Sequence, residues 1–218
     1  MTEPEYVRAT RAAYDTVAVD YARLLSTELA AKPLDRAVLA VFAELVLADG
    51  GGPVGDLGCG PGRVTAHLAS LGLDAFGVDL SPEMVAVARR THPGLRFAEG
   101  SIAALDLPDG GLGGVVAWYS VIHTPPQHQP PVFTEFHRVL AAGGHLLLAF
   151  QAGDGIRHLD QGYGHEISLD AYRMQPDRVA EELVLAGFTE IARMLREPVG
   201  FEKPSQAFLL FRKSAVTC

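Results

Sequence analysis

Three glycines at alternate positions constrain this chain more than any other feature of its sequence. Residues 53–63 read Pro-Val-Gly-Asp-Leu-Gly-Cys-Gly-Pro-Gly-Arg, so Gly58, Gly60 and Gly62 follow a short apolar segment and an acid, Asp56. Glycine lacks a Cβ atom and adopts positive φ freely, which lets a ligand lie against bare backbone. A helix that begins near Gly62 also points unpaired N–H groups at that ligand. The segment therefore predicts a nucleotide-type pocket.

The sequence after this turn alternates between short apolar runs and segments of helical character. Such alternation predicts an α/β fold with a mostly parallel sheet and helices on both faces. We expect strands at 54–57, 75–78, 95–98, 114–118, 145–150, 189–196 and 206–212, and helices at 63–71, 82–92, 132–140 and 176–186. The last two strands are expected to form a hairpin, which completes a seven-stranded sheet.

The length of 218 residues suits one domain over 1–218 with appendages. Two helical segments, Tyr6 to about Leu29 and Leu34 to about Leu47, predict an N-terminal helical cap over residues 1–49. Residues 151–175 follow neither a helical nor a strand period and contain four glycines. This segment is expected to be a loop or lid over the site.

Composition narrows the classes of partner. The longest apolar stretch, 37–48, is too short to span a bilayer, and the acidic N-terminus has no apolar signal region, so a cytoplasmic protein without a membrane partner is expected. A formal net charge of −8 argues against a nucleic-acid partner and favours a small-molecule substrate. Cys59 and Cys218, the two cysteines, do not make a disulfide framework. The oligomeric state is left open.

Glycine spacing separates two classes of nucleotide ligand. A dinucleotide-binding G-x-G-x-x-G counted from Gly58 would place its third glycine at 63, where the chain has Arg63. The D-x-G-x-G-x-G pattern instead resembles the first motif of the class I S-adenosylmethionine-dependent methyltransferases, and residues 14–213 can be laid on their Rossmann-like fold. The resemblance implies S-adenosyl-L-methionine as cofactor and S-adenosyl-L-homocysteine as product. It also implies in-line transfer of a methyl group to a heteroatom of a small-molecule acceptor, for which we favour a specialised metabolite.

An acid on the next strand suits the ribose of such a cofactor. Asp79 stands 21 positions after Gly58, at the end of the second predicted strand, where a carboxylate can accept both ribose hydroxyls. Residues 79–84, Asp-Leu-Ser-Pro-Glu-Met, match the second motif of the family. By this resemblance, Leu80 and Met84 flank the adenine.

Further cofactor contacts are implied by the resemblance alone. The family commonly has Asp where this chain has Ser101, so Ser101 and the amide of Ile102 are the expected adenine contacts. Tyr119, just after the fourth strand, is expected to meet the methionyl end through its backbone. For Arg63 two interpretations stay open, a contact with the cofactor carboxylate or a cap on an exposed helix.

His123 is the candidate catalytic residue. It lies in the turn after the fourth strand, which faces the substrate in the family, and a positioned imidazole can take a proton from a hydroxyl, thiol or amine. The alternative is that His123 only packs or orients this turn. Tyr14 and Tyr21, seven residues apart on one helix face, are expected to close over the cofactor or to pack against the domain.

The lid segment supplies candidate substrate contacts, because it is rich in polar side chains: Arg157, His158, Tyr163, His165 and Glu166. Its histidines lack the H-E-x-x-H and Cys/His spacings of zinc sites, so no metal is predicted.

Two other functions remain open at this point. A nicotinamide-dependent oxidoreductase would share the fold class and the ribose acid, although Arg63 counts against it. A non-catalytic S-adenosylmethionine-binding protein would keep the pocket without turnover.

Overall fold

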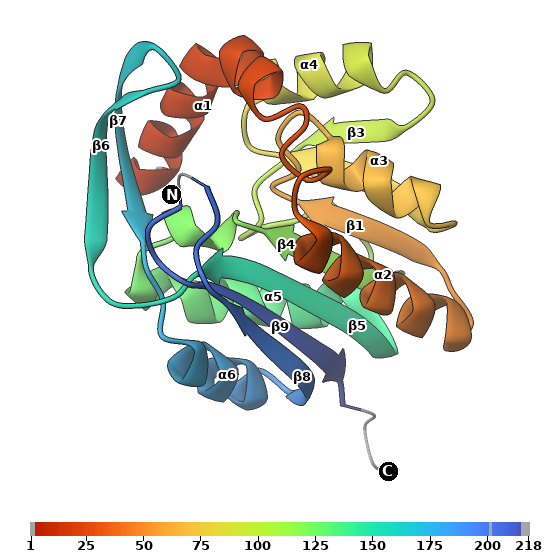
Figure 1. Ribbon diagram of the computed structural model, residues 1–218. Coiled ribbons are helices and arrows are strands. Elements are labelled where there is room, and N and C mark those ends of the chain that lie inside the picture. Colours follow the sequence, from red (N-terminus) through yellow and green to blue (C-terminus); the bar gives the residue numbers. More distant parts are fainter. Residues whose placement is uncertain (1–2, 201, 215–218) are drawn as a thin grey trace.

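A computed structural model describes residues 3–200 and 202–214 of the chain. A seven-stranded sheet runs through its centre in the order β3-β2-β1-β4-β5-β9-β8 (Figure 1). The strands are β1 (Pro53–Leu57), β2 (Asp74–Asp79), β3 (Arg96–Glu99), β4 (Leu112–Trp118), β5 (Leu140–Gln151), β8 (Phe188–Arg196) and β9 (Gln206–Lys213). The first five are parallel, and β9 pairs antiparallel with both β5 and β8. The predicted fold, including the final hairpin, is confirmed.

Helices cover both faces of the sheet, because its central strands β1, β4, β5 and β9 are buried along most of their length. The helices are α1 (Glu5–Leu24), α2 (Pro33–Ala48), α3 (Arg63–Ser70), α4 (Pro82–Thr91), α5 (Gln129–Val139) and α6 (Pro176–Leu185). One core cluster joins α5 and α6 to the sheet around Phe133 and Phe136, and a second joins α2 and α3 around Phe42 and Leu68. Both faces are therefore buried, as the parallel arrangement requires.

The strand order places a crevice between β1 and β4. After β1 the chain builds β2 and β3 on one side, and then crosses to β4 on the other. Ligands of open α/β sheets bind beyond the carboxyl ends of the strands at such a reversal. The helix α1 lies over these strand ends and packs on α4 through a cluster that includes Val17 and Met84 (Figure 1).

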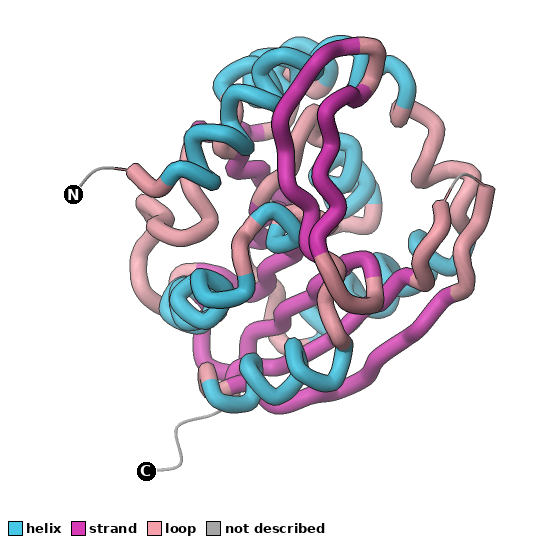
Figure 2. Tube along the Cα trace, turned by 90° about the vertical axis from the view of Figure 1, so that its left-hand side faces the viewer, coloured by secondary structure: helices cyan, strands magenta, loops and turns pink. Residues whose placement is uncertain are grey.

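Residues 151–175 differ from the expected loop. They form a two-stranded antiparallel hairpin, β6 (Ile156–Gly162) and β7 (His165–Tyr172). Tyr163 and Gly164 close it with φ angles of 54° and 89°, a conformation typical of two-residue hairpin turns. Most residues of β6 are exposed, so the buried-exposed alternation that reveals a strand in a sequence is missing. The hairpin stands beside α1, and β7 contacts that helix (Figure 2).

A smaller difference concerns the start of β5. The sequence Ala-Ala-Gly-Gly at 141–144 is expected to connect a helix to a strand, but it already belongs to β5. A register shift between Leu112 and Gly114 of the partner strand and a φ of 77° at Gly143 accommodate this irregular beginning.

No helix among residues 3–200 and 202–214 is long and apolar enough to cross a bilayer. The predicted absence of a disulfide framework involves Cys218, which lies outside the described residues; Cys59 is a free, buried thiol.

Candidate active site

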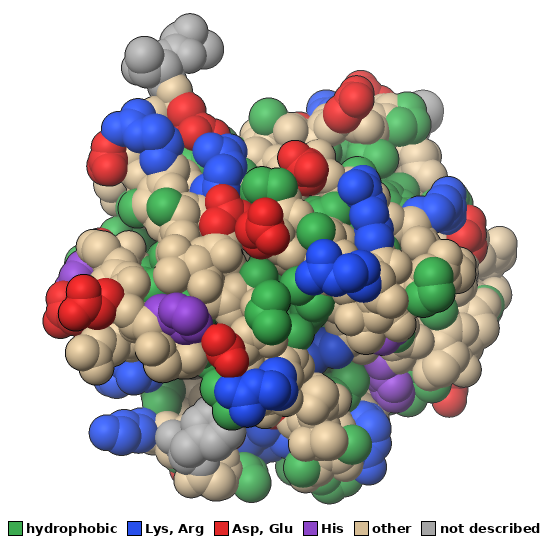
Figure 3. Space-filling model, turned by 90° about the horizontal axis from the view of Figure 1, so that it is seen from above, with side chains coloured by type: hydrophobic (Ala, Val, Ile, Leu, Met, Phe, Trp, Pro, Cys, Tyr) green, Lys and Arg blue, Asp and Glu red, His purple; other side chains and the backbone are tan. Residues whose placement is uncertain are grey.

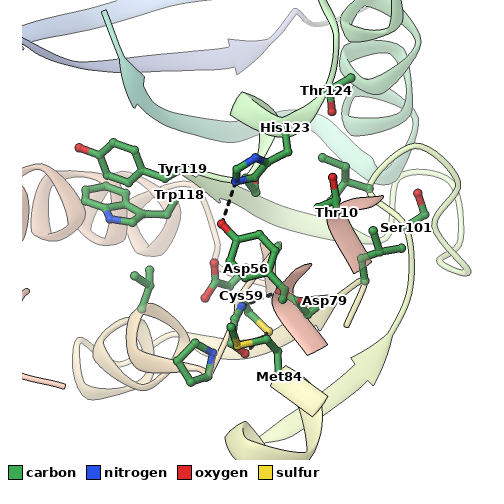
Figure 4. A pocket seen from close by; sticks show the side chains of 18 of the residues that line it. Thr10, Asp56, Cys59, Asp79, Met84, Ser101, Trp118, Tyr119, His123 and Thr124 are labelled. Carbon is green, nitrogen blue, oxygen red and sulfur yellow. Dashed lines mark hydrogen bonds between the residues drawn. The ribbon is translucent and has the colours of Figure 1, made fainter. Parts of the chain in front are cut away.

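A pocket opens at the carboxyl ends of β1, β2 and β4, beneath α1 (Figure 4). Its empty volume is about 900 Å³, including the open mouth. The structure brings together on its wall nearly all the residues predicted for cofactor binding and catalysis: Tyr14, Tyr21, Asp56, Gly58, Gly60, Arg63, Asp79, Leu80, Met84, Ser101, Ile102, Tyr119 and His123. The predicted cofactor contact that does not line the pocket is Gly62.

The three glycines have different roles. Gly58 has a φ of 81°, and a Cβ atom there would lie 2.2 Å from the Cβ of Ser120. Gly60 has a φ of 53° and faces open space, with the ring of Tyr21 3.9 Å from a Cβ. Gly62 precedes α3, and its Cβ would strike the ring of Phe97 at 2.7 Å. Gly62 therefore serves the packing behind the turn, whereas Gly60 gives a ligand access to backbone.

Asp79 is held rigidly at the end of β2. One carboxylate oxygen accepts the Gly60 amide at 2.7 Å and the other accepts the Ser81 amide at 2.9 Å. The side chain of Ser81 in turn caps α4 by accepting the amide of Met84. Burial raises the pKa of Asp79, while the two amides oppose that rise. Each carboxylate oxygen has a second lone pair, so Asp79 can still accept from ligand hydroxyls.

Asp56 is a buried acid with an unused oxygen. Its Oδ2 atom accepts the hydroxyl of Thr65 at 2.7 Å, whereas Oδ1 finds no partner in the described part of the chain. Burial raises the pKa of this carboxyl to about 7. An unpaired buried carboxylate oxygen on a pocket wall calls for a cationic or hydrogen-bond-donating ligand.

His123 is joined to two distant segments. Its Nδ1 atom lies 2.8 Å from the carbonyl oxygen of Asp170, and its Nε2 atom lies 2.7 Å from the hydroxyl of Tyr14. A carbonyl can only accept, so Nδ1 carries the proton and Nε2 accepts from Tyr14 in the neutral ring. Burial lowers the pKa of His123, which favours this neutral form, and burial also holds the pKa of Tyr14 well above its usual range. The hydroxyl oxygen of Tyr14 is then the atom that faces the pocket.

Arg63 follows the glycine turn and points inward. Its Nη1 atom forms an ion pair with Glu28 at 2.6 Å, and its side chain is 18% exposed. It is therefore a wall residue rather than a cap on an exposed helix. Tyr119 has a φ of 57° and directs its ring toward Trp118, away from the pocket centre, so that its backbone is the part that a ligand can meet (Figure 4).

The five hairpin residues predicted to contact substrate do not line the pocket. Arg157, His158 and Glu166 are exposed. Tyr163 instead packs edge-on against Tyr21, with ring centroids 4.8 Å apart, and His165 Nε2 lies 2.9 Å from an oxygen of Asp20. Both of the latter contacts join the hairpin to α1, so these side chains hold the roof of the pocket together.

Sequence reasoning named Tyr14, Tyr21 and His123 but missed other wall residues that α1 and the turn after β4 supply. Tyr6, Val7 and Thr10 line the pocket from α1, and Ser120 and Thr124 line it from the turn. A signal was present, because residues 6, 10 and 14 recur every four positions and share one helix face. Among the described residues, no group of three His, Cys, Asp or Glu side chains could hold a metal ion.

Known proteins that resemble this chain include methyltransferases, and the matched segment includes the glycine turn and Asp79. Residues 54–144 match a family model described as a methyltransferase domain. The chain is 37% identical over 90 residues to a demethylmenaquinone methyltransferase of Chlorobaculum tepidum, covering 41% of this chain and 36% of that protein. It is 28% identical over 211 residues to the N-demethylindolmycin N-methyltransferase of Streptomyces griseus, covering 81% and 88% of the two chains. The chain spans about a third to a half of the length of several other curated relatives, 36–55%.

Solved structures share the whole architecture. The 1,6-didemethyltoxoflavin-N1-methyltransferase of Burkholderia thailandensis, solved with 1,6-didemethyltoxoflavin and S-adenosylhomocysteine, superposes with a TM-score of 0.71 over 98% of this chain and 92% of that one. The sequence identity is 21%, so this likeness concerns the fold. This shared fold, the motif pattern and the match of residues 54–144 to a methyltransferase domain together support assignment to the class I S-adenosylmethionine-dependent methyltransferase family.

Proposed function

We propose that this protein transfers a methyl group from S-adenosylmethionine to a nitrogen, oxygen or sulfur atom of a small-molecule acceptor. The proposal rests on the observation that two sets of residues line the same pocket. The first set is the glycine turn with Asp79, and the second is the hydrogen-bonded pair Tyr14 and His123. The first set suits an adenosyl amino acid, and the second suits removal of a proton from the atom that is methylated.

The residues of the pocket fit the cofactor. Asp79 would hold the ribose, and the unpartnered Oδ1 of Asp56 would meet the α-ammonium group at the turn. Arg63 would face the carboxylate of the same tail. Ser101 and Ile102 would border the adenine, with Leu80 and Met84 beside it. When bound, S-adenosylmethionine would supply an electrophilic methyl group on a sulfonium. A heteroatom of the acceptor would take this methyl group by in-line attack, and S-adenosylhomocysteine would leave.

Tyr14 and His123 would handle the acceptor's proton as a pair. The hydroxyl oxygen of Tyr14 accepts the acceptor's N–H, O–H or S–H proton while its own proton passes to Nε2 of His123. The resulting imidazolium keeps its Nδ1–H bond to the carbonyl of Asp170, which stabilises the added charge. The role predicted for His123 alone thus becomes a relay through Tyr14.

The test is methyl transfer by purified protein from S-adenosylmethionine to a panel of phenols, amines and thiols, followed as S-adenosylhomocysteine formation. Tyr14→Phe and His123→Asn should each lower kcat by about 10²-fold or more, since a positioned base contributes about 10²–10⁴-fold. The dissociation constant of S-adenosylmethionine, measured by calorimetry, should change little. Tyr172→Phe is the matched control, because this half-buried tyrosine at the end of β7 does not line the pocket, and it should keep full turnover.

Two outcomes would contradict the proposal. Failure of the wild-type protein to bind S-adenosylmethionine, together with saturable binding of NAD(H), would favour the oxidoreductase alternative. Tight cofactor binding with no product from any acceptor class would favour a binding protein. Unchanged kcat in Tyr14→Phe would remove Tyr14 from the relay without affecting the rest.

A further inference from the structure

The end of the pocket that faces away from the cofactor residues carries no charged side chain. Its wall consists of Tyr6, Val7 and Thr10 from α1 and Thr124 from the turn after β4. In the close-up, Thr10, Thr124 and His123 lie on one side of the pocket, opposite Asp79 and Met84 (Figure 4). If the protein acts as proposed above, this is the place where the acceptor lies.

The charged residues of the pocket wall leave no cation available for an acidic acceptor. They are two acids, Asp56 and Asp79, and one base, Arg63. Arg63 is already paired with Glu28 at 2.6 Å, and it would also face the carboxylate of the cofactor. An anionic group on the acceptor would therefore lose its water without gaining a countercharge, which is costly in a buried site.

The basic side chains of α1 and the hairpin do not line the pocket either. Seen from above, acidic and basic side chains are interspersed over α1 and the tip of the hairpin, and no basic patch gathers among the residues drawn in colour (Figure 3). Arg11, on α1, is paired with Glu3 through both terminal nitrogens and donates its Nε–H to the carbonyl of Leu80.

Aromatic rings frame the acceptor end. The ring of Tyr6 stacks on His128 with a centroid distance of 5.1 Å and an interplanar angle of 23°. The rings of Tyr14 and His123 meet edge to face at 5.3 Å and 74°. Val7 adds a buried apolar surface. Such a wall gains most free energy by burying a planar apolar body that offers ring faces and edges.

We propose that the acceptor is a neutral aromatic or heteroaromatic molecule without a carboxylate, sulfonate or phosphate group, methylated at a ring-borne N–H or O–H. This inference deepens the proposed function by naming the class of acceptor. The proton that leaves this atom is the one that Tyr14 accepts.

The experiment compares 2-naphthol with 6-hydroxy-2-naphthoate, which differ by one carboxylate. Calorimetry with protein loaded with S-adenosylhomocysteine gives their dissociation constants, and turnover with S-adenosylmethionine gives kcat/KM. The naphthoate should bind at least about tenfold more weakly, because one unpaired buried charge costs about 1.4 kcal/mol or more. Equal or tighter binding of the naphthoate, or no binding of 2-naphthol, would overturn the inference.

A charge introduced at the acceptor end provides a second test. Thr10→Lys should shift the preference toward the naphthoate by about tenfold, since it supplies the missing cation. Thr16→Lys is the matched control, because it makes the same change on an exposed position of the same helix and should leave the preference unaltered. Binding of S-adenosylhomocysteine by the wild-type protein distinguishes failure of the proposed function from failure of this inference. If the wild-type protein does not bind S-adenosylhomocysteine, the proposed function is wrong. If it binds S-adenosylhomocysteine but prefers the naphthoate to 2-naphthol, only the inference about the acceptor is wrong.

Discussion

The two pocket glycines of the turn should respond differently to the same substitution. Gly58→Ala and Gly60→Ala both place a Cβ atom on a residue with positive φ, 81° and 53°. A left-handed conformation costs a non-glycine residue about 1–2 kcal/mol. The added Cβ at 60 meets a single ring atom at 3.9 Å, an ordinary contact, whereas at 58 it would lie 2.2 Å from the Cβ of Ser120.

The expected losses follow from these two distances. Gly60→Ala should lower the free energy of unfolding by about 1–2 kcal/mol through backbone strain alone. Gly58→Ala should lower the free energy of unfolding by a further amount of about 1–3 kcal/mol, the usual cost of overpacking a tight site. Urea unfolding at equilibrium, with the same m-value for all variants, measures both losses.

A double-mutant cycle isolates the clash. Ser120→Gly removes the atom that the new Cβ would strike, so Gly58→Ala in that background should cost no more than Gly60→Ala does in the wild type. Equal losses for the two single variants, or no recovery in the Ser120→Gly background, would refute the steric argument. Gly60→Ala should nonetheless weaken cofactor binding more than its small stability loss suggests, because its methyl group enters the pocket.

The other predictions concern the two acids of the pocket. Asp79→Asn should weaken S-adenosylmethionine binding by about tenfold to a hundredfold, the range for hydrogen bonds to a charged group. Calorimetry measures this change in affinity. Asp74→Asn, at the exposed start of the same strand, is the matched control. For Asp56, whose pKa burial raises to about 7, a cationic ligand selects the ionised form, so affinity should rise with pH by up to about tenfold per unit below pH 7 and level off above it. The same shift makes the ligand-free protein lose stability as pH rises from about 4 through about 7. Asp56→Asn should abolish both dependences, and an unchanged slope in that variant would remove Asp56 from the binding reaction.

The main sheet could be predicted from the sequence because each of its elements is locally marked. Strand interiors such as 146–150 are continuously apolar, and the glycine turn fixes where β1 ends and α3 begins. The hairpin at 156–172 could not be predicted in the same way. Its first strand, β6, is exposed along most of its length, so only β7 carries an alternating pattern. Contact between β7 and α1, which no local pattern reveals, holds the pair of strands in place.

More of the pocket wall could be predicted at the strand ends than along α1 and the turn after β4. Asp79 and Gly60 lie at positions fixed by strand ends, so spacing along the chain is enough to find them. Thr10 and Thr124 line the same pocket only because α1 lies over the ends of the strands, and no local pattern encodes that placement. The pairing of Tyr14 with His123, 109 residues apart, is of the same kind. Both residues were candidates, but the bond between them depends on tertiary structure.

That bond also has a consequence for the timing of catalysis. The chain of contacts from Tyr14 through His123 to Asp170 joins a helix, a turn and a hairpin strand around a single side chain. In the proposed reaction, an opening that moved α1 or β7 away from the turn would break at least one of these links. Such an opening would separate His123 from its partners and let the imidazolium release its proton to water, so that the next cycle begins with a neutral imidazole.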